Sequence, residues 1–200
     1  MSSWNEAQEF ERQFWSDCVN TFSEESKQRE YAKAMGLELI RVSPLGFGYN
    51  LTGARVLDVG GGPVSLLLKC VNRTGVVVDP CQFPDWVHLR YAATGLWMRR
   101  MRGEDLGETL GSFNEVWIYN VLQHTDDPAK IIANAKRLAP VLRIFEWIDT
   151  PAYEGHPQEI TRVKLEEWIG QTGQVTEFNG QNECHGRAFH GCFRHAGHNS

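Results

Sequence analysis

Short apolar runs alternate along the chain with longer segments in which apolar residues recur every three or four positions. Buried β-strands are predicted for the short runs, at residues 55–59, 75–79, 96–102, 114–119, 141–145, 174–178 and 187–193. The longer segments predict helices over 84–93, from Asp127-Pro128 onward and over 161–169. Strands that alternate with helices indicate an α/β domain with a parallel sheet between two layers of helices.

The last two predicted strands have no helix between them, so we expect them to be antiparallel neighbours. The pattern therefore predicts a doubly wound sheet of about seven strands, mostly parallel, with an antiparallel last strand. No low-complexity linker divides the chain, and residues 1–200 are interpreted as a single domain. Within it, residues 51–200 are the expected core and residues 1–50 an N-terminal helical cap over a ligand site.

Two helices are predicted before the first core strand, over 4–22 and 24–35, and Gly36 is expected to end the second. The apolar face of the first helix holds Ala7, Phe10, Phe14, Cys18 and Phe22. Trp4, Trp15 and the aromatic tract 44–49 have two interpretations: they form the roof of a pocket, or they pack the helices onto the sheet.

Three consecutive glycines, Gly60, Gly61 and Gly62, separate the first core strand from an apolar stretch that is expected to be a helix. Without Cβ atoms the backbone can turn sharply there and let a ligand approach the amides at a helix N-terminus. Asp79 ends the next strand, 19 residues after Gly60, where nucleotide-binding folds place the acid that accepts hydrogen bonds from ribose hydroxyls. Together the two signals predict a nucleotide-like cofactor.

Composition narrows the class of partner. A formal net charge of −5 and the lack of a Lys/Arg stripe argue against phosphate-driven binding to nucleic acid. The one basic cluster, Arg99, Arg100 and Arg102, is interpreted as the charged side chains of an edge strand, with a phosphate site as the alternative. A small-molecule substrate, such as a hydroxylated metabolite or a sugar, fits better, and the sequence leaves the oligomeric state open.

The expected location is the cytoplasm, without a membrane anchor. The N-terminus is polar, and no apolar run approaches the length that spans a bilayer. Five cysteines, spread widely along the chain, do not resemble a disulfide framework and are interpreted as reduced thiols.

Four segments resemble motifs of the class I S-adenosylmethionine-dependent methyltransferases, a family with a Rossmann-like seven-stranded sheet. Leu57-Asp-Val-Gly-Gly-Gly62 is similar to the first motif and Val78-Asp79-Pro80 to the second. Gly103-Glu104-Asp105-Leu106 resembles the segment after the third strand, and Tyr119-Asn-Val-Leu-Gln-His-Thr-Asp-Asp-Pro128 the fourth-strand segment of the small-molecule enzymes. The match spans roughly residues 54–150. Val64, preceded by Pro63, departs from the family's third glycine, so the helix is expected to start differently there.

The resemblance implies S-adenosylmethionine as cofactor and assigns residues to its parts. Asp79 would hold the ribose. Asp105, with Glu104 as the alternative, would accept from the adenine amino group. Backbone groups near Gly60 and Asn120 would meet the methionine end. The full implied set is Asp58, Gly60, Gly61, Gly62, Asp79, Pro80, Glu104, Asp105, Asn120 and Val121.

Methyl transfer from a sulfonium requires an acceptor held in line with the methyl carbon, and a hydroxyl acceptor also needs a route for its proton. His124, after the fourth core strand, and His156, in the loop after the fifth, are the candidate bases. Glu146, at the end of the fifth core strand, is expected to orient one of them or to bind a substrate hydroxyl. Oxygen is the favoured acceptor, with nitrogen and carbon as alternatives.

Three other interpretations stay open. Gly60, Gly62 and Asp79 also fit an NAD(P)-dependent oxidoreductase, although Ser65 stands where that fingerprint has its last glycine. A protein that binds the cofactor without turnover has the same motifs. A zinc-binding tail is the third, although it lacks a Cys-x-x-Cys pair. Its candidate ligands are Cys184, His185, His190, Cys192, His195 and His198.

Overall fold

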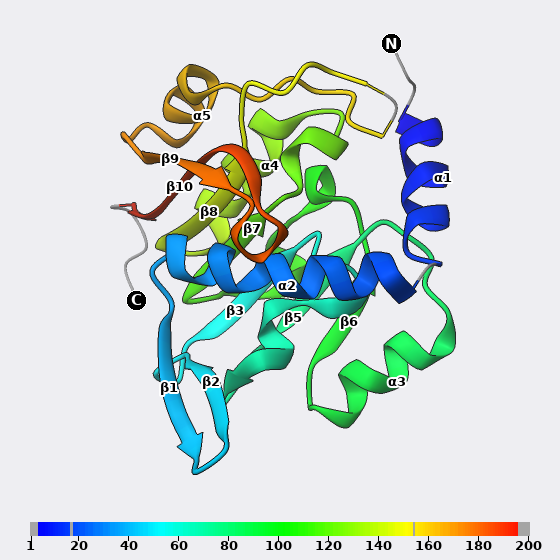
Figure 1. Ribbon diagram of the computed structural model, residues 1–200, viewed down its shortest axis with the longest axis vertical. Coiled ribbons are helices and arrows are strands. Elements are labelled where there is room, and N and C mark those ends of the chain that lie inside the picture. The colour runs from blue at the N-terminus through cyan, green and yellow to red at the C-terminus, as the bar shows by residue number, and fades with distance from the viewer. Residues whose placement is uncertain (1–3, 17, 154, 196–200) are drawn as a thin grey trace.

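The structure is a computed structural model that describes residues 4–16, 18–153 and 155–195 (Figure 1). Its centre is a seven-stranded sheet in the order β6-β5-β3-β7-β8-β10-β9. The strands are β3 (Arg55–Val59), β5 (Thr74–Asp79), β6 (Trp97–Arg100), β7 (Glu115–Tyr119), β8 (Val141–Trp147), β9 (Gln174–Asn179) and β10 (His185–Arg194).

Strand direction confirms the predicted topology. The five strands β6, β5, β3, β7 and β8 pair in parallel, while β10 pairs antiparallel with both β8 and β9. An antiparallel strand inserted between β8 and β9 is foreign to the six-stranded order of the common dinucleotide-binding fold. The sheet therefore favours a fold other than that of the nicotinamide-dependent oxidoreductases.

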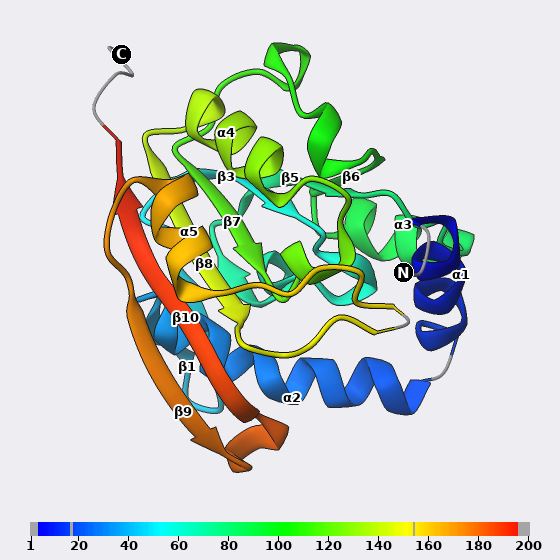
Figure 2. The ribbon, with the colours of Figure 1, turned by 90° about the horizontal axis from the view of Figure 1, so that it is seen from above.

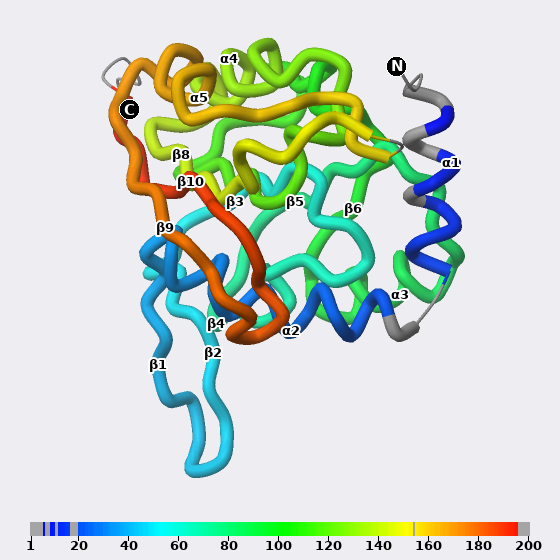
Figure 3. Tube along the Cα trace, turned by 45° about the horizontal axis from the view of Figure 1, so that its top comes forward, coloured from blue at the N-terminus to red at the C-terminus, as the bar shows by residue number. Residues whose placement is uncertain are grey.

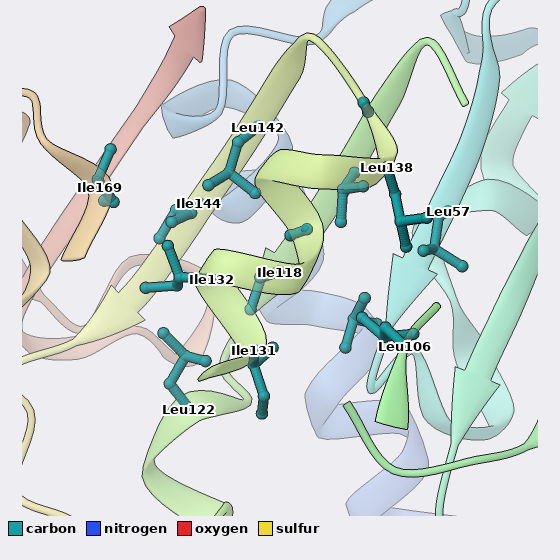
Figure 4. Packing of buried hydrophobic residues seen from close by; sticks show 14 of the residues in the cluster. Leu57, Leu106, Ile118, Leu122, Ile131, Ile132, Leu138, Leu142, Ile144 and Ile169 are labelled. Carbon is teal, nitrogen blue, oxygen red and sulfur yellow. The ribbon is translucent and has the colours of Figure 1, made fainter. Parts of the chain in front are cut away.

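Alternating residues along each strand supply two separate cores. On β3, Val56 packs on one face, whereas Leu57 and Val59 pack on the other. Helices α2 (Cys18–Ala34) and α3 (Asp85–Ala93) cover the first face, and α4 (Pro128–Leu138) and α5 (Arg162–Ile169) cover the second (Figure 2). Fully buried aliphatic side chains such as Ile131 and Ile132 contribute ~1.5–3 kcal/mol each by leaving water (Figure 4).

Helix ends follow the predicted capping chemistry. Asp127 accepts a hydrogen bond from the backbone N–H of Lys130 at 2.9 Å, and Pro128 occupies the first turn of α4. Gly36, at φ +74°, follows the end of α2 as expected. These local signals place the start of α4 and the end of α2 correctly because they do not depend on tertiary context.

The N-terminal helices divide at a different point from the predicted one. Helix α1 (Trp4–Phe14) ends early, and α2 already begins at Cys18. The carbonyl of Phe14 accepts a hydrogen bond from the side chain of Asn20 at 2.9 Å, which closes the end of α1. Trp15 leaves the helical path and packs beside Gly62. A tertiary contact therefore overrides the continuous apolar face that predicted one helix.

The glycine triplet is not followed by an α-helix. Two 3₁₀ turns, η1 (Gly62–Val64) and η2 (Leu66–Lys69), occupy the segment instead, in line with the expected departure at Val64. Pro63 lacks a backbone N–H, and the hydroxyl of Ser65 accepts a hydrogen bond from the N–H of Leu67 at 3.0 Å. These two residues divide the segment into short turns.

Residues 38–50 form strands, so only the part of the predicted N-terminal helical cap (residues 1–50) that precedes them is helical. They form an antiparallel hairpin of β1 (Glu38–Ser43) and β2 (Gly46–Asn50), and β2 also pairs with the short β4 (Cys70–Val71). The hairpin extends away from α1 (Figure 3). Its tip carries the tract 44–49, and no residue of that tract lines the cavity at the carboxyl ends of β3, β5 and β7 that is described below.

The basic cluster separates into two parts. Arg99 and Arg100 are exposed on β6, which is an edge strand, as the interpretation of an aggregation-resistant edge requires. Arg102 differs, since its guanidinium binds Asp126 at 2.7 Å and Glu104 at 3.4 Å. Arg102 therefore contributes to the region where the loops of the sheet meet, and the exposed Arg100 donates from Nε to the carbonyl of Pro80 at 3.1 Å at the edge of that region.

Candidate functional site

A cavity of about 310 Å³ lies at the carboxyl ends of β3, β5 and β7, where ligands bind in sheets of this type. Loops after these strands form its floor, and residues of α1 and α2 form its roof. Of the predicted site residues, those that line it are Gly60, Gly61, Asp79, Pro80, Glu104, Asn120, Val121, His124 and His156.

Steric crowding requires glycine at the first two positions of the triplet. Gly60 has φ +72°, and a Cβ there would lie 2.5 Å from the side chain of Val121. A Cβ on Gly61 would lie 2.7 Å from the carboxylate of Asp58. Gly62 lies outside the cavity lining, with its carbonyl accepting a hydrogen bond from the hydroxyl of Tyr91 at 2.7 Å. The triplet therefore lets the β3 and β7 loops approach closely beside the cavity.

Asp79 is the acid that ends β5, and it lines the cavity although only 6 % of its surface is exposed. Its Oδ2 accepts a hydrogen bond from the N–H of Gly62 at 3.1 Å, and its Oδ1 accepts one from the N–H of Cys81 at 2.9 Å. These two bonds fix the plane of the carboxylate. A carboxylate oxygen can accept more than one hydrogen bond, as recognition of a diol requires.

Asp58 lies beneath the glycine loop, not in the cavity lining. It is fully buried, and its Oδ2 accepts hydrogen bonds from the hydroxyls of Tyr119, at 2.6 Å, and Ser65. Burial raises the pKa of Asp58 to about 7. Its Oδ1 has no hydrogen-bond partner among the residues that the structure describes. A buried acceptor without a donor is costly in free energy.

Glu104, not Asp105, is the acid of the β6 loop that reaches the cavity, which corrects the order of preference drawn from the sequence. The carboxylate of Glu104 accepts hydrogen bonds from the N–H groups of Asp126 at 3.0 Å and Asp127 at 3.3 Å. Burial alone would raise the pKa of Glu104, but these bonds and Arg102 outweigh it and lower the pKa. Asp105 is exposed to solvent because the 3₁₀ turn Gly103–Asp105 directs neighbouring side chains apart.

Glu146 holds the loop after β7 and does not line the cavity. Its carboxylate is fully buried and accepts hydrogen bonds from the N–H groups of Val121 at 3.0 Å and Leu122 at 3.1 Å. Asn120, in the same loop, has φ +57°, an uncommon conformation for a residue with a side chain. The expectation that Glu146 touches substrate is therefore replaced by a positioning role for the loop that carries Asn120 and Val121.

Substituting Glu146 with glutamine is expected to change how stability depends on pH. Burial raises the pKa of Glu146 to about 8, above its ordinary value of 4.5. The carboxyl thus stabilises the folded protein below pH 4.5, and this contribution is lost as the pH rises through 8. The free energy of unfolding of the native protein should fall relative to that of Glu146→Gln between pH 5 and pH 8. Urea denaturation at several pH values measures the difference.

An exposed carboxyl provides the control for that experiment. Glu108→Gln should show no such trend relative to the native protein, because Glu108 lies at the surface. A constant difference between the native protein and Glu146→Gln over this pH range would contradict the raised pKa of Glu146.

The two candidate histidines are brought together at one end of the cavity. The rings of His124 and His156 are perpendicular, with centroids 4.3 Å apart. Nδ1 of His124 lies 2.7 Å from the carbonyl oxygen of Gly155, so this nitrogen carries the proton and Nε2 the lone pair. Nε2 of His156 lies 3.2 Å from the hydroxyl of Tyr153. His124 therefore anchors the backbone next to His156.

Both imidazoles are neutral near pH 7. Burial lowers the pKa of His124 to about 4. Burial, followed by the charges of His124 and Lys27, lowers the pKa of His156 to about 3. Each ring therefore presents a lone pair over the physiological pH range, and each is a weak base.

Helices α1 and α2 close the cavity with side chains that the sequence did not single out. Glu24, Lys27 and Gln28 of α2 line it, and Gln28 donates a hydrogen bond to the carbonyl of Val64. Their spacing places them on one helical face with the buried Tyr31, a signal that was present in the sequence. Phe10 of α1 packs against Gly155, so α1 contacts the loop after β8. Further lining residues that the sequence did not indicate are Tyr119 and Trp147.

The Cys/His-rich tail has another role in the part of the chain that is described. His190 is buried, with Nδ1 3.0 Å from the carbonyl of Ala34 and Nε2 2.9 Å from the hydroxyl of Thr176. Cys192 is exposed, and Cys184 is buried beside α2. Among the described residues no three potential ligands gather as a metal site would need, and His198 lies outside them. In that same part of the chain no helix has both the length and the apolar character needed to cross a membrane.

Comparison with known proteins supports the fold. No family model and no curated protein sequence matches the chain. Among solved structures, the N-terminal domain of EvdMO1 with bound SAH is similar, with a TM-score of 0.54 and 15% identity over 86% of this chain and 80% of that one. A Burkholderia thailandensis 1,6-didemethyltoxoflavin-N1-methyltransferase, bound to 1,6-didemethyltoxoflavin and S-adenosylhomocysteine, has a TM-score of 0.53 and 16% identity over 70% of each chain.

The small RNA methyltransferase HEN1 is also similar, with a TM-score of 0.57 and 12% identity over 89% of this chain and 26% of that one. All three identities are low, so these likenesses concern the fold. The chain has the fold of the class I S-adenosylmethionine-dependent methyltransferases, as the resemblance of its motifs implied.

Proposed function

We propose that the chain binds S-adenosylmethionine in this cavity and transfers its methyl group to a hydroxyl of a small molecule. The observation that carries the proposal is the placement of Asp79 and Glu104 on one cavity wall, after neighbouring strands, beside the glycine loop. Solved structures with this fold hold S-adenosylhomocysteine, the demethylated cofactor, in the EvdMO1 domain and the toxoflavin enzyme.

The residues present fit the cofactor. Asp79 offers two fixed carboxylate oxygens, which suit the two ribose hydroxyls. Glu104 is an acceptor for the adenine amino group. The ammonium at the methionine end is a donor, and the unpartnered Oδ1 of Asp58 lies beneath the loop where that end is expected. Pro80, Gly60, Gly61, Asn120 and Val121 complete the proposed cofactor wall, with Gly62 behind it.

The bound cofactor supplies an electrophilic methyl group on a sulfonium. The chain's own residues then have two tasks, to hold the acceptor in line and to receive its proton. The neutral His156, held beside His124, is the proposed base, and His124 is a positioning residue. Phe10, Phe14 and Trp15 of the roof exclude water and favour an apolar or aromatic acceptor body.

A small molecule is the proposed partner, although HEN1, a protein that acts on small RNA by its title, shares the fold. The net charge of −5 and the neutralised Arg102 offer little attraction to a polyanion. The proposed setting is the cytoplasm, with neither nucleic acid nor membrane as partner.

Binding of S-adenosylhomocysteine tests the cofactor assignment first. We expect saturating S-adenosylhomocysteine to raise the melting temperature, because a ligand that binds only the folded state stabilises it. NADH at the same concentration is the control, and it should have no effect. Stabilisation by NADH alone would favour the oxidoreductase interpretation, and stabilisation by neither compound would contradict the proposal. Transfer of a labelled methyl group to hydroxylated acceptors then tests the reaction.

A further inference from the structure

A second, smaller cavity of about 160 Å³ adjoins the first. Lys27, Trp147 and His156 line both cavities, so these three side chains form the boundary between them. The second cavity has no glycine-loop residue in its lining and lies between α2, the loop after β8 and the turn that joins β9 to β10. A molecule that extends past His156 would enter it.

Most of the residues that line the second cavity have polar side chains, whereas the roof of the first cavity is aromatic. Lys27 and Glu183 bring opposite charges to it, and both already have partners: Lys27 pairs with Glu24 at 3.4 Å, and Glu183 accepts a hydrogen bond from the hydroxyl of Ser23. The other polar lining residues are Gln123, Thr150, Gln158 and His185. The wall therefore mixes donors and acceptors and has no excess charge of one sign.

Gln123 supplies an independent sign of a missing ligand. Only 4 % of its surface is exposed, and it lines the second cavity but not the first. Asn120 donates from Nδ2 to Glu24 at 3.4 Å, so its Oδ1 is the atom that accepts from Nε2 of Gln123 at 2.7 Å. These two successive hydrogen bonds fix the orientation of the Gln123 amide. Its Oε1 is left buried, with no hydrogen-bond partner in the described part of the chain.

An unpaired buried acceptor costs free energy that a donor recovers. The amide nitrogen of Gln123 faces Asn120 and His124, both of which line the first cavity. Gln123 itself lines the second cavity and not the first, so a donor that reaches this amide oxygen would come from the second cavity. A hydroxyl placed there can donate to Oε1 and still accept from neighbouring donors, which a carboxylate cannot do.

We propose that the second cavity binds a hydroxyl-bearing part of the acceptor, such as a sugar ring, remote from the atom that is methylated. This inference rests on the proposed function and specifies its substrate class: an apolar or aromatic body beneath the α1 roof, joined to a polyhydroxylated group. The boundary residues Trp147 and His156 separate the reacting hydroxyl from the hydroxyls that only serve recognition.

A matched pair of probes tests the inference. Calorimetric titrations into protein saturated with S-adenosylhomocysteine would compare 4-hydroxyphenyl β-D-glucoside with 4-methoxyphenol, which has the same ring and free hydroxyl but no sugar. We expect the glucoside to bind at least about tenfold more tightly, the effect of one hydrogen bond to a buried acceptor. Equal affinities, or no binding of the glucoside, would overturn the inference.

Three variants locate the effect. Gln123→Met removes the acceptor at similar size and should reduce the advantage of the glucoside to about twofold or less. Thr150→Val removes a hydroxyl from the same cavity and should reduce it in part, while Thr109→Val, at an exposed position in another part of the chain, should leave it unchanged. An undiminished advantage in both cavity variants would contradict the assignment of this cavity.

The same titrations separate this inference from the proposed function. Binding of S-adenosylhomocysteine is measured first, and it depends on the first cavity. If that binding is retained and the glucoside shows no advantage, only the second-cavity inference fails. If S-adenosylhomocysteine itself does not bind, the proposed function fails together with it.

Discussion

Asp79→Ala is expected to abolish measurable binding of S-adenosylmethionine, a loss of at least about a hundredfold in affinity. The carboxylate of Asp79 is the acceptor proposed for both ribose hydroxyls, and each hydrogen bond to a charged group contributes ~1.5–3 kcal/mol. The substitution also removes the acceptor of the N–H groups of Gly62 and Cys81, so the glycine loop is held to β5 by the hydrogen bond from the N–H of Gly60 to the carbonyl of Val78 without its second bond through Gly62. Calorimetric titration with S-adenosylhomocysteine measures the loss.

Two further variants distinguish this effect from general destabilisation. Asp79→Asn keeps the size of the side chain and one acceptor oxygen, so its affinity should fall between those of the native protein and Asp79→Ala. Asp85→Ala removes an exposed carboxylate from α3, six residues along the chain, and should bind the cofactor normally. Unchanged affinity in Asp79→Ala would remove the ribose assignment and with it the main support for the cofactor site.

The part of the site that local sequence determines could be predicted. Gly60 and Asp79 lie at the ends of short strands that are mostly apolar, and in parallel sheets those ends converge on one edge. The antiparallel end of the sheet followed from the lack of a helix between the last two strands. Each of these inferences uses neighbours within about twenty residues, so tertiary packing has little opportunity to alter them.

Other features depend on contacts between distant segments, and the sequence did not reveal them. Glu104 faces the cavity and Asp105 faces solvent because backbone N–H groups of residues 126 and 127 capture the first carboxylate. In the same way, the carboxylate of Glu146 accepts hydrogen bonds from backbone N–H groups of the loop after β7. In each case a buried carboxylate accepts hydrogen bonds from N–H groups more than twenty residues away in the sequence. A short sequence motif does not indicate such distant partners.

The roof of the cavity shows a third reason why the site could be predicted only in part from the sequence. The apolar face shared by Phe10 and Phe14 was recognised, yet the break after Phe14 was not, because it arises where Trp15 meets Gly62. The polar face of α2, with Glu24, Lys27 and Gln28, was not assigned to the site from the sequence. A polar face next to a buried Tyr31, on a helix expected to cover a site, is the pattern that identifies such residues.

His156→Ala is expected to lower the rate of methyl transfer to a hydroxyl by about a hundredfold while leaving the affinity for S-adenosylhomocysteine unchanged. A positioned base contributes ~10²–10⁴ to such a rate, and the low pKa of His156, about 3, favours the lower end. The side chain lies across the cavity end from the glycine loop and has no proposed contact with the cofactor. Single-turnover transfer to an acceptor, alongside calorimetric titration with S-adenosylhomocysteine, measures both quantities.

The pH dependence tests whether His156 acts as a base or only as part of the wall. Because its pKa of about 3 and that of His124, about 4, lie well below neutrality, both rings stay neutral from pH 6 to pH 8, and the native rate should show no histidine titration there. His156→Gln keeps a polar side chain of similar reach but offers no base. If His156→Gln restores the native rate, the ring serves only to shape the cavity. If His156→Gln transfers methyl groups as slowly as His156→Ala, the loss of rate is due to the missing lone pair of His156. His124→Asn should also lower the rate, because it removes the hydrogen bond that anchors Gly155 next to His156.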